Sequence, residues 1–118
     1  MIVWDVDKGV FKRASTSDYR EALYALLQLI EPGYVTSYGD LARLLGVNPR
    51  FIGYLLKTND KPIVIPCHRV VRSSGDLGGY SLGGREFKKK LLMLEGVVFS
   101  GKRVSRDCFK NLYSLLIE

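Results

Sequence analysis

Hydrophobic residues in the first third of the chain predict a hairpin followed by one helix. Two short apolar segments, residues 2–6 and 10–12, flank a turn and predict a small N-terminal hairpin. Further along, apolar residues recur at helical spacing from Tyr19 to Ile30. Ser15-Thr16-Ser17-Asp18 offers N-cap side chains before this run, and Pro32-Gly33 ends it. We therefore expect a helix with one face in the core.

The next stretch predicts two capped helices joined by a tight link. Ser37 and Asp40 have capping-box spacing ahead of the first helix, and Gly46 suits the position just after its end. Asn48 and Pro49 suit the N-cap and first residue of the second helix. The apolar positions of the two helices are Leu41, Ala42, Leu44, Leu45, Phe51, Ile52, Leu55 and Leu56. This is the helix-turn-helix pattern, although any helical hairpin in a core can resemble it.

Short extended segments follow the second of these helices. The β-branched residues 63–65 and 70–71 predict two buried extended segments. A glycine-rich loop covers residues 73–84. Because it matches neither of the phosphate-binding glycine motifs, we interpret it as backbone that can approach a ligand closely.

The last third of the chain predicts a basic amphipathic helix and a short final helix. Residues 85–95 form the basic helix, which Gly96 ends, and Lys88-Lys89-Lys90 reads as its solvated face. Its core candidates are Phe87, Leu91, Leu92 and Leu94. A turn at residues 100–102 precedes the final helix, which we expect near residues 109–117.

Composition is that of an ordinary globular protein. The 118 residues are 47% hydrophobic and 25% charged, enough for one domain with a modest core. No apolar run approaches membrane-spanning length, and a start that contains Asp5 and Asp7 lacks the basic and apolar parts of a signal peptide. We therefore expect a single domain over residues 1–118 in an intracellular protein, with no membrane partner.

The positive charge is unevenly spread. The net charge is +6: residues 1–42 hold four Lys/Arg against six Asp/Glu, and residues 43–118 hold fourteen against six. The second portion therefore carries +8, which favours an anionic partner such as nucleic acid. A generic basic surface would give the same count.

The reactive side chains of the chain meet at Pro66-Cys67-His68-Arg69. Cysteine reacts as the thiolate, and an adjacent imidazole is a base that can generate it. His68 is the only histidine, and the second cysteine, Cys108, lies far away in the sequence, so we expect two free thiols. A zinc site is a poor reading, because these few residues lack ligand spacing. The structural alternatives are a small buried cysteine and a satisfied core histidine.

Residues 35–96 resemble a known family. The segments that carry the resemblance are Val35-Thr36-Ser37-Tyr38-Gly39-Asp40-Leu41-Ala42, Asn59, Ile65-Pro66-Cys67-His68-Arg69-Val70-Val71, Gly79-Tyr80-Ser81, Gly83-Gly84 and Leu94-Glu95-Gly96. In this order and spacing they resemble the C-terminal, active-site domain of the methylated-DNA–protein-cysteine methyltransferases, also called alkylguanine-DNA alkyltransferases. The resemblance and the element pattern together predict a mostly α (α+β) fold, a winged-helix-like helix-turn-helix domain with a small β-hairpin and short strands.

The resemblance implies a single-use reaction in DNA repair. Such proteins flip an alkylated guanine out of the duplex and move the alkyl group from its O6 oxygen to their own cysteine. Here Cys67 would be the nucleophile, and His68 would deprotonate it through a water while Glu95 orients the imidazole. Tyr38 would contact the flipped base or the adjoining phosphate and donate a proton to the departing guanine. No cofactor and no metal are implied.

The resemblance also implies how DNA is held. The expected partner is double-stranded DNA containing alkylated guanine, bound through the minor groove by what is expected to be a monomer. Arg50 would fill the gap left in the stack, and Asn59 would tie the recognition helix to the active-site turn. The remaining expected contacts are Gly53 on the recognition helix, Arg69, the backbone of Cys67 and Val70 at the base edge, and Tyr80 and Ser81 in the guanine pocket.

Two features of the chain differ from the usual family pattern. Family members usually carry a second, N-terminal domain, and here residues 1–34 precede the match. Small relatives, the alkyltransferase-like proteins, bind alkylated DNA without turnover and replace the cysteine, so lesion recognition that recruits other repair factors is an alternative function. Phe51 and Tyr54 occupy recognition-helix positions that are often small, and we expect their bulk to alter the approach to the groove. A sequence-specific helix-turn-helix regulator ranks last, because no dimerisation element is evident.

Overall fold

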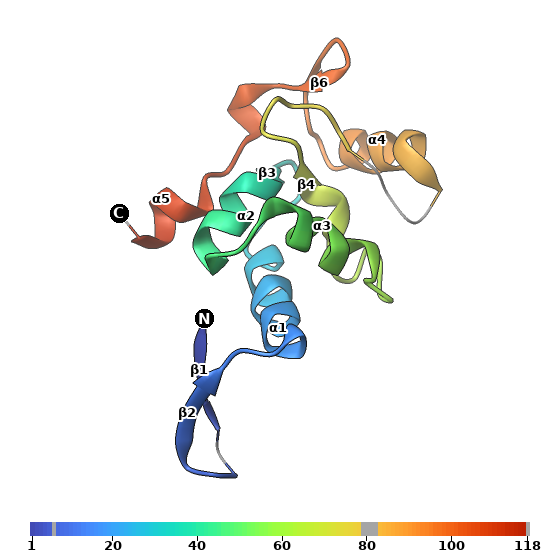
Figure 1. Ribbon diagram of the computed structural model, residues 1–118. Helices are drawn as coiled ribbons and strands as arrows, with labels where there is room; N and C mark the ends of the chain where they lie inside the picture. Colours follow the sequence, from blue (N-terminus) through green and yellow to red (C-terminus); the bar gives the residue numbers. More distant parts are fainter. Residues whose placement is uncertain (6, 79–82, 118) are drawn as a thin grey trace.

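A computed structural model describes residues 1–5, 7–78 and 83–117 of the chain. Across these ranges helices dominate and three two-stranded sheets accompany them, so the predicted α+β class is confirmed. Figure 1 shows a helical body from which the N-terminal hairpin projects. Within the same ranges, no helix has the length and apolar character needed to cross a membrane.

The N-terminal part contains the predicted hairpin and helix. Its elements are β1 (Ile2–Asp5), β2 (Val10–Arg13) and α1 (Thr16–Leu27), and the two strands pair antiparallel. Ser15 and Asp18 form a capping box, in which the Ser15 N–H donates to the Asp18 carboxylate over 2.8 Å. The helix ends at Leu27, earlier than predicted, and a turn carries Ile30 into the core, where it is 1% exposed.

The helix-turn-helix prediction is confirmed. Its elements are β3 (Thr36–Ser37), α2 (Tyr38–Leu45) and α3 (Pro49–Lys57). The Ser37 hydroxyl accepts the Asp40 N–H at 3.0 Å, and the Asn48 side chain accepts the Arg50 N–H at 2.8 Å, so each helix has its predicted N-cap. Gly46 ends α2 with φ at 67°, a left-handed conformation that glycine adopts without steric cost.

Asp40 has different partners from those that its capping-box spacing predicts. Its carboxylate accepts the Leu112 N–H at 2.7 Å and the Tyr113 N–H at 3.1 Å, at the start of α5 (Leu112–Ile117). The Thr36 hydroxyl donates to the same carboxylate over 2.9 Å. A negative charge at these first N–H groups stabilises a helix start, so Asp40 joins α2 to the C-terminal helix.

The cysteine lies in a short turn between α3 and a small parallel sheet. Two elements make this part, η1 (Cys67–Arg69) and β4 (Val70–Val71), and β4 pairs with β3 so that Thr36 lies opposite Val70. The prediction of a buried extended segment at residues 63–65 is wrong, because Ile63 and Val64 are 47% and 73% exposed. Ile63 has φ at 75°, and a bridge between Pro62 and Ile65 closes a tight turn around it.

Helix α4 (Gly84–Leu94) turns a different face inward from the one predicted. Leu92 is buried as expected, but Phe87 and Leu94 are 38% and 85% exposed. Lys88, predicted on a solvated face, is completely buried. Residues 88 and 92 are one turn apart and therefore share the inward face.

The C-terminal part forms a second hairpin and a short helix. Its elements are β5 (Phe99–Ser100), β6 (Arg103–Val104), η2 (Arg106–Cys108) and α5, so the predicted turn and final helix are confirmed. Two buried clusters make the core: one joins α1, α2 and α3, and the other lies under α4 and the second hairpin. Val70 belongs to the first cluster and Val71 to the second, because successive strand residues face opposite sides. The Cys67 turn therefore lies where the two clusters meet.

Candidate active site

Backbone hydrogen bonds fix Cys67 in its turn. Its N–H donates to the Ile65 carbonyl at 2.7 Å, and the Val70 N–H donates back to the Cys67 carbonyl. Parallel pairing of β4 with β3 then places this turn beside Tyr38, the first residue of α2. Cys67 is 5% exposed and forms no disulfide, and Cys108 is also a free thiol, as predicted.

A chain of charged and polar groups lies behind the cysteine. His68 is completely buried, and its Nε2 lies 3.0 Å from Glu95 Oε2. Arg69 grips the same carboxylate in a two-pronged pair, with Nε 3.0 Å from Oε1 and Nη2 2.6 Å from Oε2. The Arg69 guanidinium also donates to the Ile30 carbonyl at 2.7 Å. Arg69 therefore fixes Glu95, and Glu95 fixes the imidazole next to Cys67.

The protonation states of this chain follow from burial and hydrogen bonding. Burial lowers the pKa of His68 below 6.5, against the opposing hydrogen bond and charge of Glu95. Burial raises the pKa of Glu95, but hydrogen bonds from Arg69 and His68 outweigh it and bring that pKa below 4.5. Near neutral pH, a carboxylate therefore faces a neutral imidazole. Because a carboxylate can only accept, the imidazole hydrogen is on Nε2, and Nδ1 is the basic nitrogen.

Tyr38 keeps its proton at this site. Burial raises the pKa of its hydroxyl above 10.0, Arg72 opposes this shift, and the charge of Cys67 adds to it. Gly78, with φ at 72°, lies so close that a Cβ there would be 3.1 Å from the Tyr38 hydroxyl. A glycine is therefore required at position 78 both for the backbone conformation and for the space that Tyr38 occupies.

A pocket of about 870 Å³ opens between α3 and the loop that follows β4. Its described lining residues are Tyr38, Gly39, Pro49, Arg50, Gly53, Leu56, Lys57, Arg72, Ser73, Ser74 and Gly78. Cys67 is absent from this described lining, but Tyr38 and Leu56 belong to the same hydrophobic cluster as Cys67. The pocket thus adjoins the hydrophobic cluster that contains Cys67. The guanidinium groups of Arg50 and Arg72 and the ammonium group of Lys57 lie at its wall.

Two predicted residues on and after α3 shape this region. A Cβ on Gly53 would meet nothing within 4 Å, so the glycine leaves open space on the pocket side of the helix. Asn59 is 6% exposed, and its side chain donates to the Ile65 carbonyl at 3.2 Å and accepts the Lys61 N–H at 2.9 Å. It therefore joins the end of α3 to the segment that leads into the Cys67 turn.

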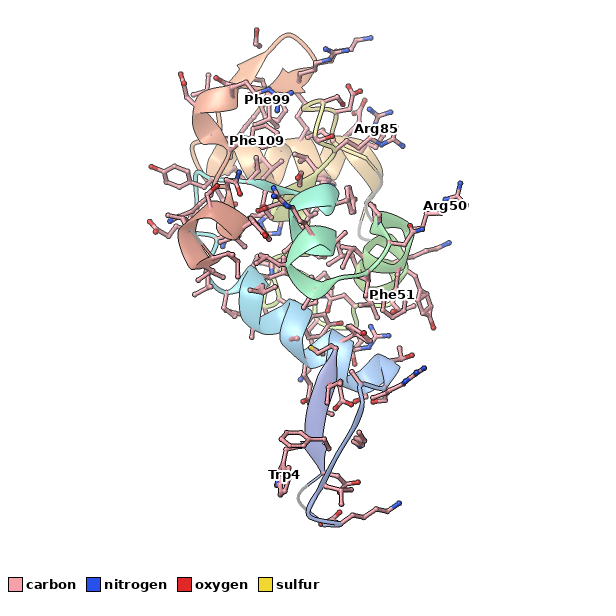
Figure 2. The ribbon with its side chains drawn as sticks, turned by 60° about the vertical axis from the view of Figure 1, so that its left-hand side comes forward. Trp4, Arg50, Phe51, Arg85, Phe99 and Phe109 are labelled. Atoms are coloured by element: carbon pink, nitrogen blue, oxygen red, sulfur yellow. The ribbon has the colours of Figure 1, made fainter. Side chains whose placement is uncertain are left out.

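The bulky residues of α3 form an aromatic group. Phe51 stacks on Tyr54 with ring centres 6.2 Å apart and meets Tyr19 edge-on at 5.6 Å. Tyr54 is 50% exposed, and Figure 2 shows Arg50 and Phe51 extending on the same side of the molecule. Phe51 therefore packs against α1, and Tyr54 adds exposed aromatic surface to α3.

Of the four remaining predicted contacts, the structure describes Val70 and Arg69. The carbonyl of Val70 accepts a hydrogen bond from Lys88, and Arg69 points to Glu95 and Ile30. Tyr80 and Ser81, expected in the guanine pocket, lie outside the described residues.

Sequence reasoning missed two basic residues at this site. Arg72 lines the pocket and acts electrostatically on Tyr38, but nothing in its sequence context distinguishes it from other surface arginines. Lys88 is buried beside the cysteine. The sequence analysis assigned it to a solvated face because it belongs to a run of three lysines. A helical register that pairs position 88 with the apolar position 92 is the signal that could have revealed it.

Comparisons with known proteins agree on one family. Residues 18–97 match the family described as 6-O-methylguanine DNA methyltransferase, DNA binding domain. The chain is 40% identical over 113 residues to a methylated-DNA--protein-cysteine methyltransferase of Pyrobaculum aerophilum, covering 83% of this chain and 75% of that protein. It is 38% identical over 98 residues to the protein of the same name in Methanothermobacter thermautotrophicus, where it covers 83% of this chain and 55% of the relative. The chain thus spans only about half of the latter.

Solved structures give the same result. The O6-methylguanine-DNA methyltransferase of Pyrococcus kodakaraensis strain KOD1 aligns with a TM-score of 0.62 at 46% identity, covering 67% of this chain and 46% of that chain. Mycobacterium tuberculosis OGT in complex with DNA aligns with a TM-score of 0.62 at 36% identity, covering 70% and 50%. S. pombe Atl1, in complex with damaged DNA containing O6-carboxymethylguanine, shares the fold with a TM-score of 0.63 at 24% identity, covering 79% of this chain and 89% of that chain. The chain belongs to the 6-O-methylguanine DNA methyltransferase family.

Proposed function

We propose that this protein repairs DNA by moving an alkyl group from the O6 oxygen of guanine to its own Cys67. The observation that carries the proposal is the arrangement behind the cysteine, in which Arg69 holds Glu95 and Glu95 holds the neutral imidazole of His68. This is a nucleophile, a base and an orienting group. The relatives named methylated-DNA--protein-cysteine methyltransferase support the same reaction.

The reaction balances with these residues alone. Nδ1 of His68 takes the thiol proton through a water, and the Cys67 thiolate attacks the alkyl carbon. A sulfur–carbon bond forms while the bond from that carbon to O6 breaks, and the electron pair passes into the guanine ring. Tyr38, which holds its proton because it is buried, supplies that proton to the departing guanine. No step in this scheme removes the alkyl group from the Cys67 sulfur, so each protein molecule acts once.

The pocket supplies the setting for base extrusion. A guanine inside the duplex cannot reach Cys67, so the nucleotide must leave the stack. We place α3 in the minor groove, with the exposed Arg50 in the vacated position and Lys57 near a phosphate, because both side chains line the pocket. The partner is double-stranded DNA containing alkylated guanine, and the M. tuberculosis relative solved with DNA supports nucleic acid as the ligand.

Lesion recognition without transfer is a second candidate, and one observation favours it. Cys67 is 5% exposed and is absent from the described pocket lining, so a base could occupy the pocket without meeting the sulfur. In that case the protein would bind alkylated guanine and recruit other repair factors.

Intact mass after incubation with duplex DNA bearing O6-methylguanine separates the two candidates. Alkyl transfer adds one methyl group to the protein, and the tryptic peptide containing Cys67 carries it. The Cys67→Ser variant is the matched control, and it should bind the lesion without gaining mass. Selective binding by the wild-type protein with an unmodified Cys67 would reject transfer and support lesion recognition.

A further inference from the structure

Lys88 is a fully buried lysine beside the active-site turn. Its Nζ donates to the carbonyl of Val70 at 2.7 Å and to the carbonyl of Leu77 at 2.5 Å. It also lies 5.9 Å from the centre of the Tyr38 ring. On the same helix Lys90 is exposed, so burial of position 88 results from its place on the inward face and not from the lysine run itself.

The two carbonyls belong to different walls of the cysteine site. Val70 opens β4, directly after the turn that holds Cys67. Leu77 precedes Gly78, whose backbone lies against the Tyr38 hydroxyl. A single ammonium group therefore connects the strand that directly follows the Cys67 turn to the loop that lies against Tyr38. A neutral amine would hold these two oxygens more weakly, because charge-assisted hydrogen bonds are about twice as strong as neutral ones.

Charged groups from several elements act on this amine. Burial lowers the pKa of Lys88 from 10.5 to about 8, the Cys67 thiolate opposes that shift, and Arg85 and Arg72 add to it. The positive charge of Lys88 also acts on His68 and helps to lower the pKa of the imidazole. Lys88 is thus a cation at neutral pH and loses its charge as the pH rises through about 8.

We propose that Lys88 is a positioning residue for Cys67: its ammonium ion ties the Val70 and Leu77 carbonyls together and presents a positive charge to the thiolate. The inference rests on the proposed function for its biological meaning, since the charge matters most when Cys67 must be an anion. It adds to the His68 relay, because His68 moves a proton whereas Lys88 stabilises the anion that remains. In this proposal Lys88 acts through Cys67.

Reactivity of Cys67 toward iodoacetamide tests this role without any alkylated DNA. The thiolate displaces iodide from the reagent, forming one sulfur–carbon bond, so the rate follows the thiolate. We expect Lys88→Met to slow carboxamidomethylation of the Cys67 peptide roughly tenfold at neutral pH and to move its pH profile upward. Cys108, in the other core cluster, is the internal reference, and Lys90→Met on the exposed side of α4 is the matched control. Equal Cys67 profiles in the two variants would overturn the proposal.

The wild-type protein offers a second measurement that needs no variant. Coupling between two titrating groups is reciprocal, so removing the Cys67 charge must change the titration of Lys88. NMR of isotope-labelled lysines should show the Lys88 midpoint moving below about 8 once Cys67 is alkylated. An unchanged midpoint would overturn the proposal even if Lys88→Met fails to fold. Because both readouts use iodoacetamide, a protein that never accepts a methyl group from guanine can still show this coupling.

Discussion

At the scale of single residues, burial sets the protonation state of His68, whereas hydrogen bonding sets that of Glu95. His68 and Glu95 are both partly or fully removed from water, yet their pKa values move for different reasons. Burial dominates for the imidazole, so it stays neutral, whereas two-pronged pairing with Arg69 keeps the carboxylate charged. The result is a neutral imidazole next to Cys67 whose hydrogen is on Nε2, so that Nδ1 is its basic nitrogen.

Glu95→Gln tests the orienting role at this scale. The amide cannot accept from both Arg69 and His68 as the carboxylate does, so the imidazole loses its fixed tautomer. We expect alkyl transfer to slow at least tenfold, a part of the roughly 10²–10⁴-fold that general-base catalysis contributes. Single-turnover methyl transfer measures the rate, and Glu86→Gln, exposed in the first turn of α4, should match the wild type. A wild-type rate in Glu95→Gln at unchanged lesion affinity would remove Glu95 from the mechanism.

The neutral state of His68 also predicts a pH dependence of stability. The pKa of His68 is below 6.5 in the folded protein, so an unfolded chain binds this proton first as the pH falls. The free energy of unfolding should therefore decrease on acidification below 6.5, by about 1.4 kcal/mol for each pH unit between the unfolded and folded pKa values. The pKa of Glu95 lies below 4.5 in the folded protein, so the stability that its charge contributes is lost only as the pH falls below 4.5.

Urea unfolding of the wild type and of His68→Gln isolates this effect. Glutamine can still donate a hydrogen bond to Glu95 but does not titrate. The decrease between pH 6.5 and 4.5 should disappear in the variant. Parallel curves for the two proteins would mean that His68 is charged or exposed in the folded state.

At the scale of helices and strands, local signals located the elements, and tertiary contacts decided how they were used. Asn48 and Gly46 mark helix ends through bonds to their own neighbours, so sequence alone predicted them. The partner of Asp40 could not be predicted in this way, because α5 lies 72 residues away from it in the chain. Lys88 is similar: its run of lysines indicates solvent, and only the packing of α4 against the Cys67 turn shows that it is buried.

The catalytic candidates also differ in how far the sequence alone could reveal them. Cys67 and His68 are adjacent in sequence and could be recognised directly, whereas Glu95 was reached only through the family resemblance. The part played by Arg69 was missed, because its bond to Glu95 spans 26 residues and its bond to the Ile30 carbonyl spans 39. Long-range pairs of this kind leave no periodic pattern in the sequence.

Arg50→Ala tests the use of α3 as the element that opens the duplex. If Arg50 occupies the space of the extruded base, its loss removes part of the few kcal/mol needed for unstacking. We expect methyl transfer from duplex DNA to slow roughly tenfold, which corresponds to about 1.4 kcal/mol, with little change on single strands. Arg13→Ala, exposed on the projecting hairpin, is the matched control. Equal slowing on both substrates would assign Arg50 to general DNA affinity.

At the scale of the whole molecule, charge is separated along the chain. Residues 1–42 carry a net −2, whereas residues 43–118 carry +8 and supply the basic residues of the described pocket lining, Arg50, Lys57 and Arg72. Figure 2 shows Trp4 at the far end of the hairpin and Arg50 on the body, well apart from each other. The field that attracts DNA should therefore come mainly from residues 43–118, and only the basic residues facing the duplex should release counterions on binding.

Salt dependence of binding distinguishes those residues from the rest of the basic surface. Each Lys or Arg that contacts a phosphate contributes about −0.9 to the slope of log K against log salt concentration on duplex DNA. Lys57 lines the pocket at the end of α3, so Lys57→Ala should make the slope shallower by about that amount. It should weaken damaged and undamaged duplexes equally, because a phosphate contact carries no information about the lesion. Lys8→Ala, on the hairpin turn, removes the same charge from the chain and should leave the slope unchanged. An equal change in the two variants would show that net charge, and not the placement of α3 against the duplex, governs binding.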